Sequence, residues 1–391
     1  DAHSHVVQQS LKFAVVNLDP SPIGDVKSIE DIQRKLRQRI EETKLEPGKW
    51  LFGWGYDDTG VVERRHPTRE DLDAVSKTHP ILLMHISSHL MTANSKALDL
   101  AGITADTPDP DGGKIQRMPS TNEPNGVLEE KAMGFMLKAL PSPTADRALD
   151  MLAYGLNKYA EAGITTAQEG GGVPGMLKLL ESGAKAGIMP IDVASYPVYA
   201  PLDDETFSPI AAMKMVLGGN WSDAENEAAE QEPKTHADDD GYRGYANMTL
   251  EEVVKYVRMA DDAGIPFLAH TNGDAATDLL IEAIRQVRGD QPRPELRSVI
   301  IHAQTIREDQ LDFAAKQGLV PSFFPIHVQF WGDRHRDIFL GPERAARIDP
   351  ARSALDRGMK ITLHHDAPVA GINILNVVSS AVNRRTTSGK Q

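Results

Sequence analysis

The sequence contains no cysteine, and aromatic residues make up only 6% of its 391 residues. Without cysteine there are no disulfide bonds, no thiolate metal ligands and no cysteine nucleophile, and the redox compartment stays undetermined. Long apolar runs are also missing, since none reaches the roughly 18 consecutive residues that a transmembrane helix needs. If the protein binds a metal ion, its ligands must therefore be histidines and carboxylates.

Basic residues are outnumbered, with 42 Lys and Arg against 56 Asp and Glu, which gives a net charge of −14. Nucleic-acid binding relies on a basic surface that releases counterions from phosphates, so we expect no nucleic-acid partner. The acidic segments 223–232 and 238–240 are interpreted as solvated loops. No basic and apolar leader is visible before His3, so we expect a cytoplasmic protein without a membrane partner, with a periplasmic or secreted location left open. The oligomeric state also stays open, with a homodimer as one candidate.

Short β-branched or apolar runs alternate with segments of helical periodicity, which is typical of the α/β class. Helices are predicted at 275–288 and 307–317, and glycines before several strands resemble the C-caps of short helix-to-strand loops. Strands are predicted at 2–7, 164–169, 191–198, 212–217, 265–270, 298–302, 319–324 and 360–365. Eight such strands predict a (β/α)8 TIM-like barrel built from residues 1–10 and 142–391.

This strand count requires a large insertion after the first strand, at residues 11–141. The insertion contains a predicted helix at 29–43, a turn at 54–56, a strand at 81–86 and a loop rich in Gly, Pro and Asp at 106–125. We expect it to form a subdomain that covers the mouth of the active site.

Histidines and one aspartate recur where predicted strands end. His3 and His5 are separated by one residue, so on a strand they point to the same face, although an isolated pair is a weak signal. His270 and His302 end the fifth and sixth strands, and Asp366 directly follows the eighth. Barrel enzymes keep their chemistry at these strand ends. The five residues therefore predict a metal site of the zinc type, with Mn, Fe or Co also compatible.

Lys214 lies inside an apolar strand, where an ammonium group pays a desolvation cost unless it is paired or neutralised. The residues leave two interpretations open. Lys214 forms an interior ion pair or lies at an exposed strand edge, or its amine has taken up CO2 to become a carbamate that bridges two metal ions.

The order His3, His5, Lys214, His270, His302 and Asp366 resembles the ligand order of the amidohydrolase superfamily. More specifically, the chain resembles amidohydrolase family 3, which includes N-substituted formamide deformylases. Further similar stretches cover nearly the whole chain and lie at 88–98, 109–113, 126–128, 331–336, 340–344, 366–369 and 383–385.

This resemblance implies a metal-dependent hydrolase of carbon–nitrogen bonds other than peptide bonds, acting on an amide, formamide or N-acyl group of a small molecule. His3 and His5 would hold the more buried ion, His270 and His302 the second, and carboxylated Lys214 would bridge them. Asp366 would bind metal and move the proton, so Asp366 and His302 are the expected catalytic residues. Zinc is the usual ion in such sites, with one or two per chain.

The chain departs from the family pattern in three places. Residues 218–220 replace a segment that is usually Asp-Gly-Ser-like, and His365 stands where Ser is frequent. Family members also carry a small β-sandwich built from segments on both sides of the barrel, and this chain is expected to lack most of it.

The substrate-binding prediction comprises His89, Trp54, Trp331 and Glu169, which are placed at strand ends or in aromatic stretches. Aromatic residues at such spacing are more often part of a core, and that alternative stays open. His66, His79, His236 and His327 are interpreted as ordinary surface or loop residues.

Three other functions stay open at this point. A deaminase or cyclic-amide hydrolase of the same superfamily would share the ligands, and its mononuclear form needs no carbamate on Lys214. A non-catalytic metal-binding barrel is a second alternative, although the titratable Asp366 argues against it. A glycoside hydrolase that uses Glu129 and Glu169 has little support.

Overall fold

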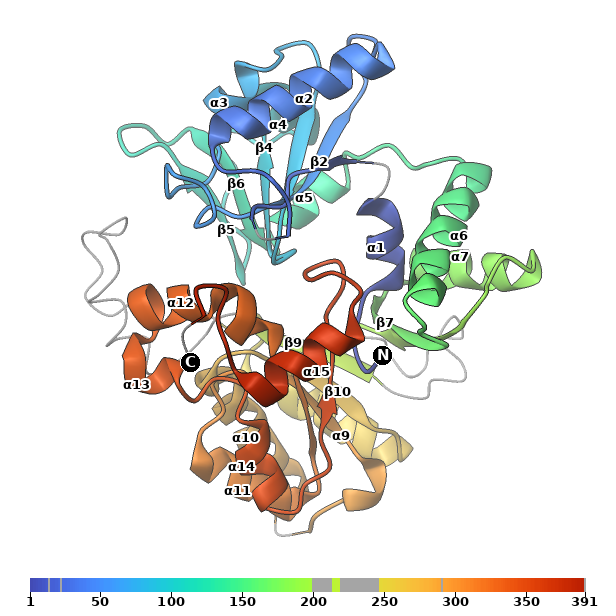
Figure 1. Cartoon of the computed structure of the whole chain (residues 1–391), viewed down its shortest axis with the longest axis vertical. Coiled ribbons are helices and arrows are strands. Elements are labelled where there is room, and N and C mark those ends of the chain that lie inside the picture. Colours follow the sequence, from blue (N-terminus) through green and yellow to red (C-terminus); the bar gives the residue numbers. More distant parts are fainter. Residues whose placement is uncertain (13–14, 22, 199–212, 219–245, 290, 390–391) are drawn as a thin grey trace. The chain divides into compact units, whose positions relative to one another are not determined.

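The computed structural model describes residues 1–12, 15–21, 23–198, 213–218, 246–289 and 291–389 (Figure 1). The chain divides into two compact units. Unit 1 comprises Asp1–Val7 and Leu156–Gln391, and unit 2 comprises Gln8–Gly155. The predicted insertion at 11–141 falls within unit 2. The predicted acidic loops at 223–232 and 238–240, the departure at 219–220 and His236 lie outside the described residues.

Unit 1 contains a five-stranded parallel sheet in the order β13-β12-β11-β10-β9. Its strands are β9 (Met213–Gly218), β10 (Phe267–Thr271), β11 (Val299–His302), β12 (Val320–Phe323) and β13 (Thr362–Leu363). The connecting helices include α9 (Leu250–Ala263), α10 (Asp274–Arg288), α11 (Glu308–Gln317) and α14 (Ala351–Asp356). A second, two-stranded parallel sheet joins β7 (Thr166–Gly172) to β8 (Asp192–Pro197), and α7 (Pro174–Lys185) lies between them in the chain.

The core of unit 1 lies between the five-stranded sheet and its helices, and Figure 1 shows α9 and α10 beside β10. Phe267 and Ile300 on the strands are fully buried against Val257 and Leu280 on the helices. Local signals set the helix ends. Thr249 forms a capping box with Glu252 at the start of α9, and Gly264 in the left-handed conformation (φ 68°) ends it.

The seven strands predicted from residue 164 onward are found, with end shifts of at most three residues. The strand predicted at 2–7 is wrong, because helix α1 (Val6–Lys12) starts directly after His5. The β-branched pair Val6 and Val7 favoured a strand on propensity. In the structure the carboxylate of Glu169 accepts the Val7 amide at 2.8 Å, which satisfies one N–H that a first helical turn leaves without a helical partner.

Within the described ranges the strands of unit 1 form these two separate sheets, and no closed barrel is present. The fold is thus α/β, with the parallel strands and connecting helices that the sequence predicted. Of the described helices, none combines the length and apolar character that a membrane span requires.

Unit 2 contains a six-stranded mixed sheet in the order β1-β2-β3-β4-β6-β5. The strands are β1 (Val16–Asn17), β2 (Leu51–Tyr56), β3 (Ile81–His85), β4 (Leu90–Ala93), β5 (Gly113–Arg117) and β6 (Pro124–Glu130). The first three are mutually parallel and the others pair antiparallel. Helix α2 (Ile29–Thr43) has the predicted bounds. Further helices are α3 (Arg69–Asp73), α4 (Ser95–Ala101) and α5 (Met133–Leu137), and α6 (Ala145–Glu161) begins in this unit.

Both faces of the sheet in unit 2 are covered. Leu83 packs with Ile32 and Leu36 of α2, whereas its neighbour Leu82 packs with Ala97 of α4 on the other face. Successive strand side chains point to opposite faces, so this alternation builds two cores on one sheet. Because β2 and β3 are parallel, their carboxyl ends lie at the same end of the sheet.

Candidate metal centre

Two histidines of the N-terminal segment converge on one carboxylate of unit 1. Asp366 Oδ1 lies 3.4 Å from His3 Nε2 and 3.5 Å from His5 Nε2. The three residues offer ligand atoms that all lie within 4.8 Å of one another. Main-chain bonds hold the segment in place, because His5 donates its amide to the Ala367 carbonyl and Gly170 donates to Ser4, both at 2.8 Å.

Gly170 allows the close approach that this arrangement needs. A Cβ atom at this position would lie 2.3 Å from the His3 ring, so a larger residue would displace the ligand. The reason for a glycine at this position is therefore steric, because its lack of a Cβ lets the His3 ring approach the backbone.

His270 and His302 extend the cluster from the carboxyl ends of β10 and β11. Their ring centroids are 4.4 Å apart, and His302 Nε2 lies 3.8 Å from Asp366 Oδ2. Strand alternation would turn His302 to the helix-covered face with Ile300. The left-handed backbone of His302 (φ 69°) breaks that alternation, and Asp366 is also left-handed (φ 51°). Such conformations cost about 1–3 kcal/mol each and cluster at functional sites.

Further polar groups hold the ligand rings. His364 Nε2 lies 3.3 Å from His302 Nδ1, and its other ring nitrogen lies 2.9 Å from Ser322 Oγ. The fully buried Glu169 places Oε1 3.6 Å from His5 Nδ1. Metal-binding histidines usually have such a partner on their second nitrogen, because it sets the ring orientation and the tautomer.

The protonation states suit a metal centre. Burial, reinforced by the neighbouring His270, holds the pKa of His302 well below its usual value, so this ring is neutral. Burial alone would raise the pKa of Asp366, but the hydrogen bond from His5 and the neighbouring His3 outweigh it and hold that pKa well below the usual range. Neutral imidazole and ionised carboxylate are the forms that bind metal ions.

The spacing of these groups also fits a divalent ion. Ligand atoms bound at about 2.0–2.2 Å in a tetrahedral shell lie roughly 3.3–3.6 Å apart. The two distances from Asp366 Oδ1 to His3 and His5, 3.4 and 3.5 Å, fall in this interval and exceed those of an ordinary hydrogen bond. The residues present therefore fit a metal ion of the zinc type.

Lys214 lies on β9, where its backbone pairs with Leu268, two positions before the level of His270. Its side chain lies outside the described part of the structure, so the carbamate stays a prediction.

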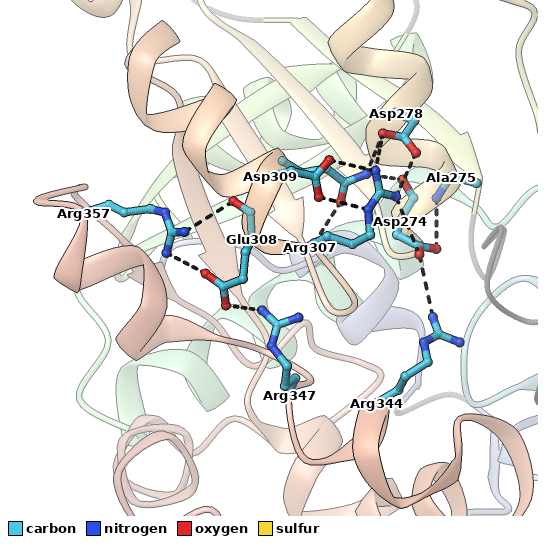
Figure 2. Close-up of polar contacts among 10 residues, drawn as sticks. Asp274, Ala275, Asp278, Arg307, Glu308, Asp309, Arg344, Arg347 and Arg357 are labelled. Atoms are coloured by element: carbon cyan, nitrogen blue, oxygen red, sulfur yellow. Dashed lines mark hydrogen bonds and ion pairs between the residues drawn. The ribbon is translucent and has the colours of Figure 1, made fainter.

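Arginines fix the segments that follow the ligand strands β10 and β11 (Figure 2). Arg307, at the start of α11, donates to both oxygens of Asp278 on α10 at 2.8 and 2.9 Å and also binds Asp309. Arg344 on α13 (Gly341–Ala345) lies 3.7 Å from the carboxylate of Asp274, at the start of α10. These ion pairs tie the start of α11 and helix α13 to the first two turns of α10, just beyond His270 and His302.

The predicted substrate-binding residues lie in different surroundings. Trp331 ends a π-helical turn (His327–Trp331) of unit 1 and packs near Phe324, with ring centroids 6.2 Å apart. Glu169 supports His5 from a buried position. His89 and Trp54 belong to unit 2, where His89 pairs with Glu130 at 2.8 Å and Trp54 is buried in β2. Their predicted contact with substrate stays a prediction.

Sequence reasoning missed His327, which it treated as an ordinary residue. The His327 ring lies 6.0 Å from that of His302, and its Nδ1 is 3.5 Å from Asp349 Oδ2. Burial raises the pKa of Asp349, and His327 opposes that shift. The available signal was position, because His327 lies four residues before the family-like stretch at 331–336. His66 was missed in the same way, since it lies beside Asp58 and His85 in unit 2.

Comparison with known proteins gives consistent matches. The model described as "Amidohydrolase family" matches residues 1–391. The N-substituted formamide deformylase of Arthrobacter pascens is 27% identical over 100% of this chain and 73% of its own length. Protein LONG AFTER FAR-RED 3 of Arabidopsis thaliana is 27% identical over 98% of this chain and 67% of its own length. A crystal structure of an uncharacterized metal-dependent hydrolase from Pyrococcus horikoshii aligns with a TM-score of 0.70 at 20% identity, covering 100% of this chain and 74% of that one, which shows a shared fold.

Proposed function

The chain belongs to the amidohydrolase family, and from this premise we propose that it is a metal-dependent hydrolase of a carbon–nitrogen bond in a small molecule. The convergence of His3, His5, His302 and Asp366 at the ends of separate segments carries the proposal. An amide, formamide or N-acyl group is the proposed substrate class. The relative named N-substituted formamide deformylase supports the formamide among these.

The proposed cofactor is zinc, held by His3, His5, His270, His302 and Asp366, with carboxylated Lys214 as a bridge if two ions bind. A divalent ion at such a site supplies Lewis acidity toward a carbonyl oxygen and lowers the pKa of water. For residues 1–10 and 142–391 we propose the (β/α)8 barrel of the superfamily, in which the strand ends carry these ligands.

The chain's own residues then perform the proton transfers and the positioning. Asp366 is ionised, so its carboxylate can accept a proton from the attacking water and later donate it to the leaving nitrogen. His302 stays neutral and is held by His364, which keeps its Nε2 directed at Asp366. Glu169 holds His5 in the same way. General acid–base catalysis of this kind contributes about 10²- to 10⁴-fold.

The test is activity toward a panel of formamides and N-acyl amines, with zinc per chain measured on the same samples. We expect Asp366→Asn to reduce kcat by about 10²-fold or more while zinc is retained through the histidines. Asp356→Asn, on the exposed face of α14, serves as the control. A zinc-loaded Asp366→Asn protein with near-normal kcat would contradict the proposal. Loss of about one zinc ion per chain in Lys214→Ala would support the Lys214 bridge, and an unchanged zinc content would favour the mononuclear form.

A further inference from the structure

A second group of metal-binding side chains lies entirely within unit 2. Strands β2 and β3 are parallel and their last residues, Tyr56 and His85, pair in register. Asp58 is the second residue after β2, and His66 lies in the loop that continues from it. The carboxyl ends of two neighbouring parallel strands thus bring three separate segments to one edge of the sheet.

The distances within this group are short. Asp58 Oδ1 lies 3.1 Å from His85 Nε2 and 3.9 Å from His66 Nδ1. One ligand atom from each of the three residues can be chosen so that all lie within 4.8 Å of one another. The side chain of His85 is 7% exposed, whereas those of Asp58 and His66 are 24% and 22% exposed, so water reaches the group from one side.

We propose that Asp58, His66 and His85 form a second binding site, which takes a divalent transition-metal ion with zinc as the best match. Two imidazoles and one carboxylate are a donor set typical of zinc, and a water molecule completes four-coordination. The spacings of 3.1 and 3.9 Å lie on either side of the roughly 3.3–3.6 Å expected around zinc. Only small side-chain movements are therefore needed to close the shell.

The residues around the group support the ligand rings. His85 Nδ1 lies 2.8 Å from Ser87 Oγ, which supplies the second-nitrogen partner that a metal-binding histidine needs. The fully buried Tyr56 ring packs edge-on against both histidines, with centroids 6.0 Å from His66 and 5.1 Å from His85. Its hydroxyl is fixed by a 2.8 Å hydrogen bond with Thr92.

Tyr56 itself is a support and not a ligand. Burial raises its pKa above the usual value, and the carboxylates of Asp58 and Asp57 add to that shift against the opposing bond to Thr92. The hydroxyl therefore keeps its proton. The same carboxylates make the surroundings favourable to a cation.

An ion-free hydrogen bond between Asp58 and His85 is the alternative. The Ser87 amide lies 3.2 Å from His85 Nδ1, and this contact favours the tautomer whose Nε2–H donates to Asp58. Metal binding requires the other tautomer, in which Nδ1–H donates to Ser87 Oγ at 2.8 Å. In both tautomers His85 Nδ1 keeps Ser87 Oγ as a partner, and the zinc-binding measurement below distinguishes them.

Zinc binding by the full chain tests the proposal independently of any hydrolase activity. The predicted histidine ligands of unit 1 are first changed together (His3→Gln, His5→Gln, His270→Gln and His302→Gln), so that zinc retained by the chain reports on unit 2. In this background we expect Asp58→Asn to weaken zinc binding by about 100-fold or more, since even outer partners of a site contribute 10- to 100-fold. Asn is isosteric with Asp and can still accept from His85, which favours retention of the fold. Asp106→Asn, on an exposed loop of the same unit, is the matched control and should bind zinc as its parent does.

A second measurement keeps the test decisive if a variant fails to fold. Crystals of the unaltered chain grown with zinc should show an anomalous scattering peak between Asp58, His66 and His85. Equal zinc affinity of the folded Asp58→Asn and Asp106→Asn proteins, or no peak at this position in zinc-containing crystals, would overturn the proposal. Neither result depends on whether the centre at Asp366 is catalytic.

Discussion

Replacing Glu169 by Gln tests whether this buried carboxylate positions His5, one of the proposed metal ligands. Glu169 Oε1 lies 3.6 Å from His5 Nδ1, while its Oε2 accepts the Val7 amide at 2.8 Å. Gln is nearly isosteric and can still accept one amide, but it removes the charge that orients and polarises the imidazole. Loss of such a partner reduces metal affinity by about 10- to 100-fold. This factor corresponds to about 1.4–2.7 kcal/mol of binding free energy.

The assay is a zinc titration of the metal-free protein against a chromophoric chelator, with the fold checked by circular dichroism. Glu181→Gln is the matched control, because Glu181 lies exposed on α7, directly after the strand that carries Glu169. We expect Glu169→Gln to weaken the zinc affinity and Glu181→Gln to leave it unchanged. If the folded Glu169→Gln protein binds zinc as tightly as the control, the orienting role is refuted. An equal loss in both variants would show that the effect is not specific to this pair.

Three further outcomes are expected. Arg288 and Asp261 form a buried bidentate ion pair with two 2.7 Å bonds. Arg288→Met leaves Asp261 buried without its partner and should lower the free energy of unfolding by about 3–5 kcal/mol in urea titrations, whereas adding Asp261→Leu should restore most of this loss. A double variant as unstable as Arg288→Met would contradict this. Burial lowers the pKa of His302 and His335 well below the usual value and that of His365 to about 4. Below pH about 6.5 the unfolded state therefore binds more protons than the folded state. The free energy of unfolding should fall as the pH drops, by up to about 1.4 kcal/mol per pH unit for each histidine. Thermal melts between pH 7.5 and 5 measure this, and a Tm that does not change with pH would contradict it. Chelation should lower Tm reversibly, because an ion at 1,000 times its Kd stabilises the folded chain by about 4 kcal/mol; an unchanged melt after verified zinc removal would argue against a resident ion.

The sequence predicted the parts of the fold whose signals are local. Helix α2 at Ile29–Thr43 has an amphipathic pattern and a Ser28 cap, and its bounds agree with the prediction. The apolar strands β10 and β11 were likewise recognisable from their own residues. The strand predicted at 2–7 failed because the conformation of Val6 and Val7 depends on Glu169, whose contribution a window of neighbouring residues does not contain.

The same distinction separates the predicted and the missed site residues. His270 and His302 stand at strand ends, so their shared position follows from the parallel order of the strands. His327 approaches His302 from a π-helical turn, and the strand pattern gives no indication of such a contact. A residue on a loop can be assigned to a site only when the contact itself is known.

One structural principle connects the centre in unit 1 with the proposed site in unit 2. In each unit two neighbouring parallel strands end in or next to metal-binding side chains, β10 and β11 with His270 and His302, and β2 and β3 with Asp58 and His85. Parallel strands end at the same edge of a sheet, so residues far apart in sequence are brought within a few ångströms there. In both units a segment outside the strand pair adds a further ligand, namely Asp366 in unit 1 and His66 in unit 2. The environments differ, because the centre of unit 1 is deeply buried and the group in unit 2 is open to water on one side. Solvent competition should therefore make the unit 2 site the weaker of the two, and a zinc titration of the unaltered chain should resolve two affinities.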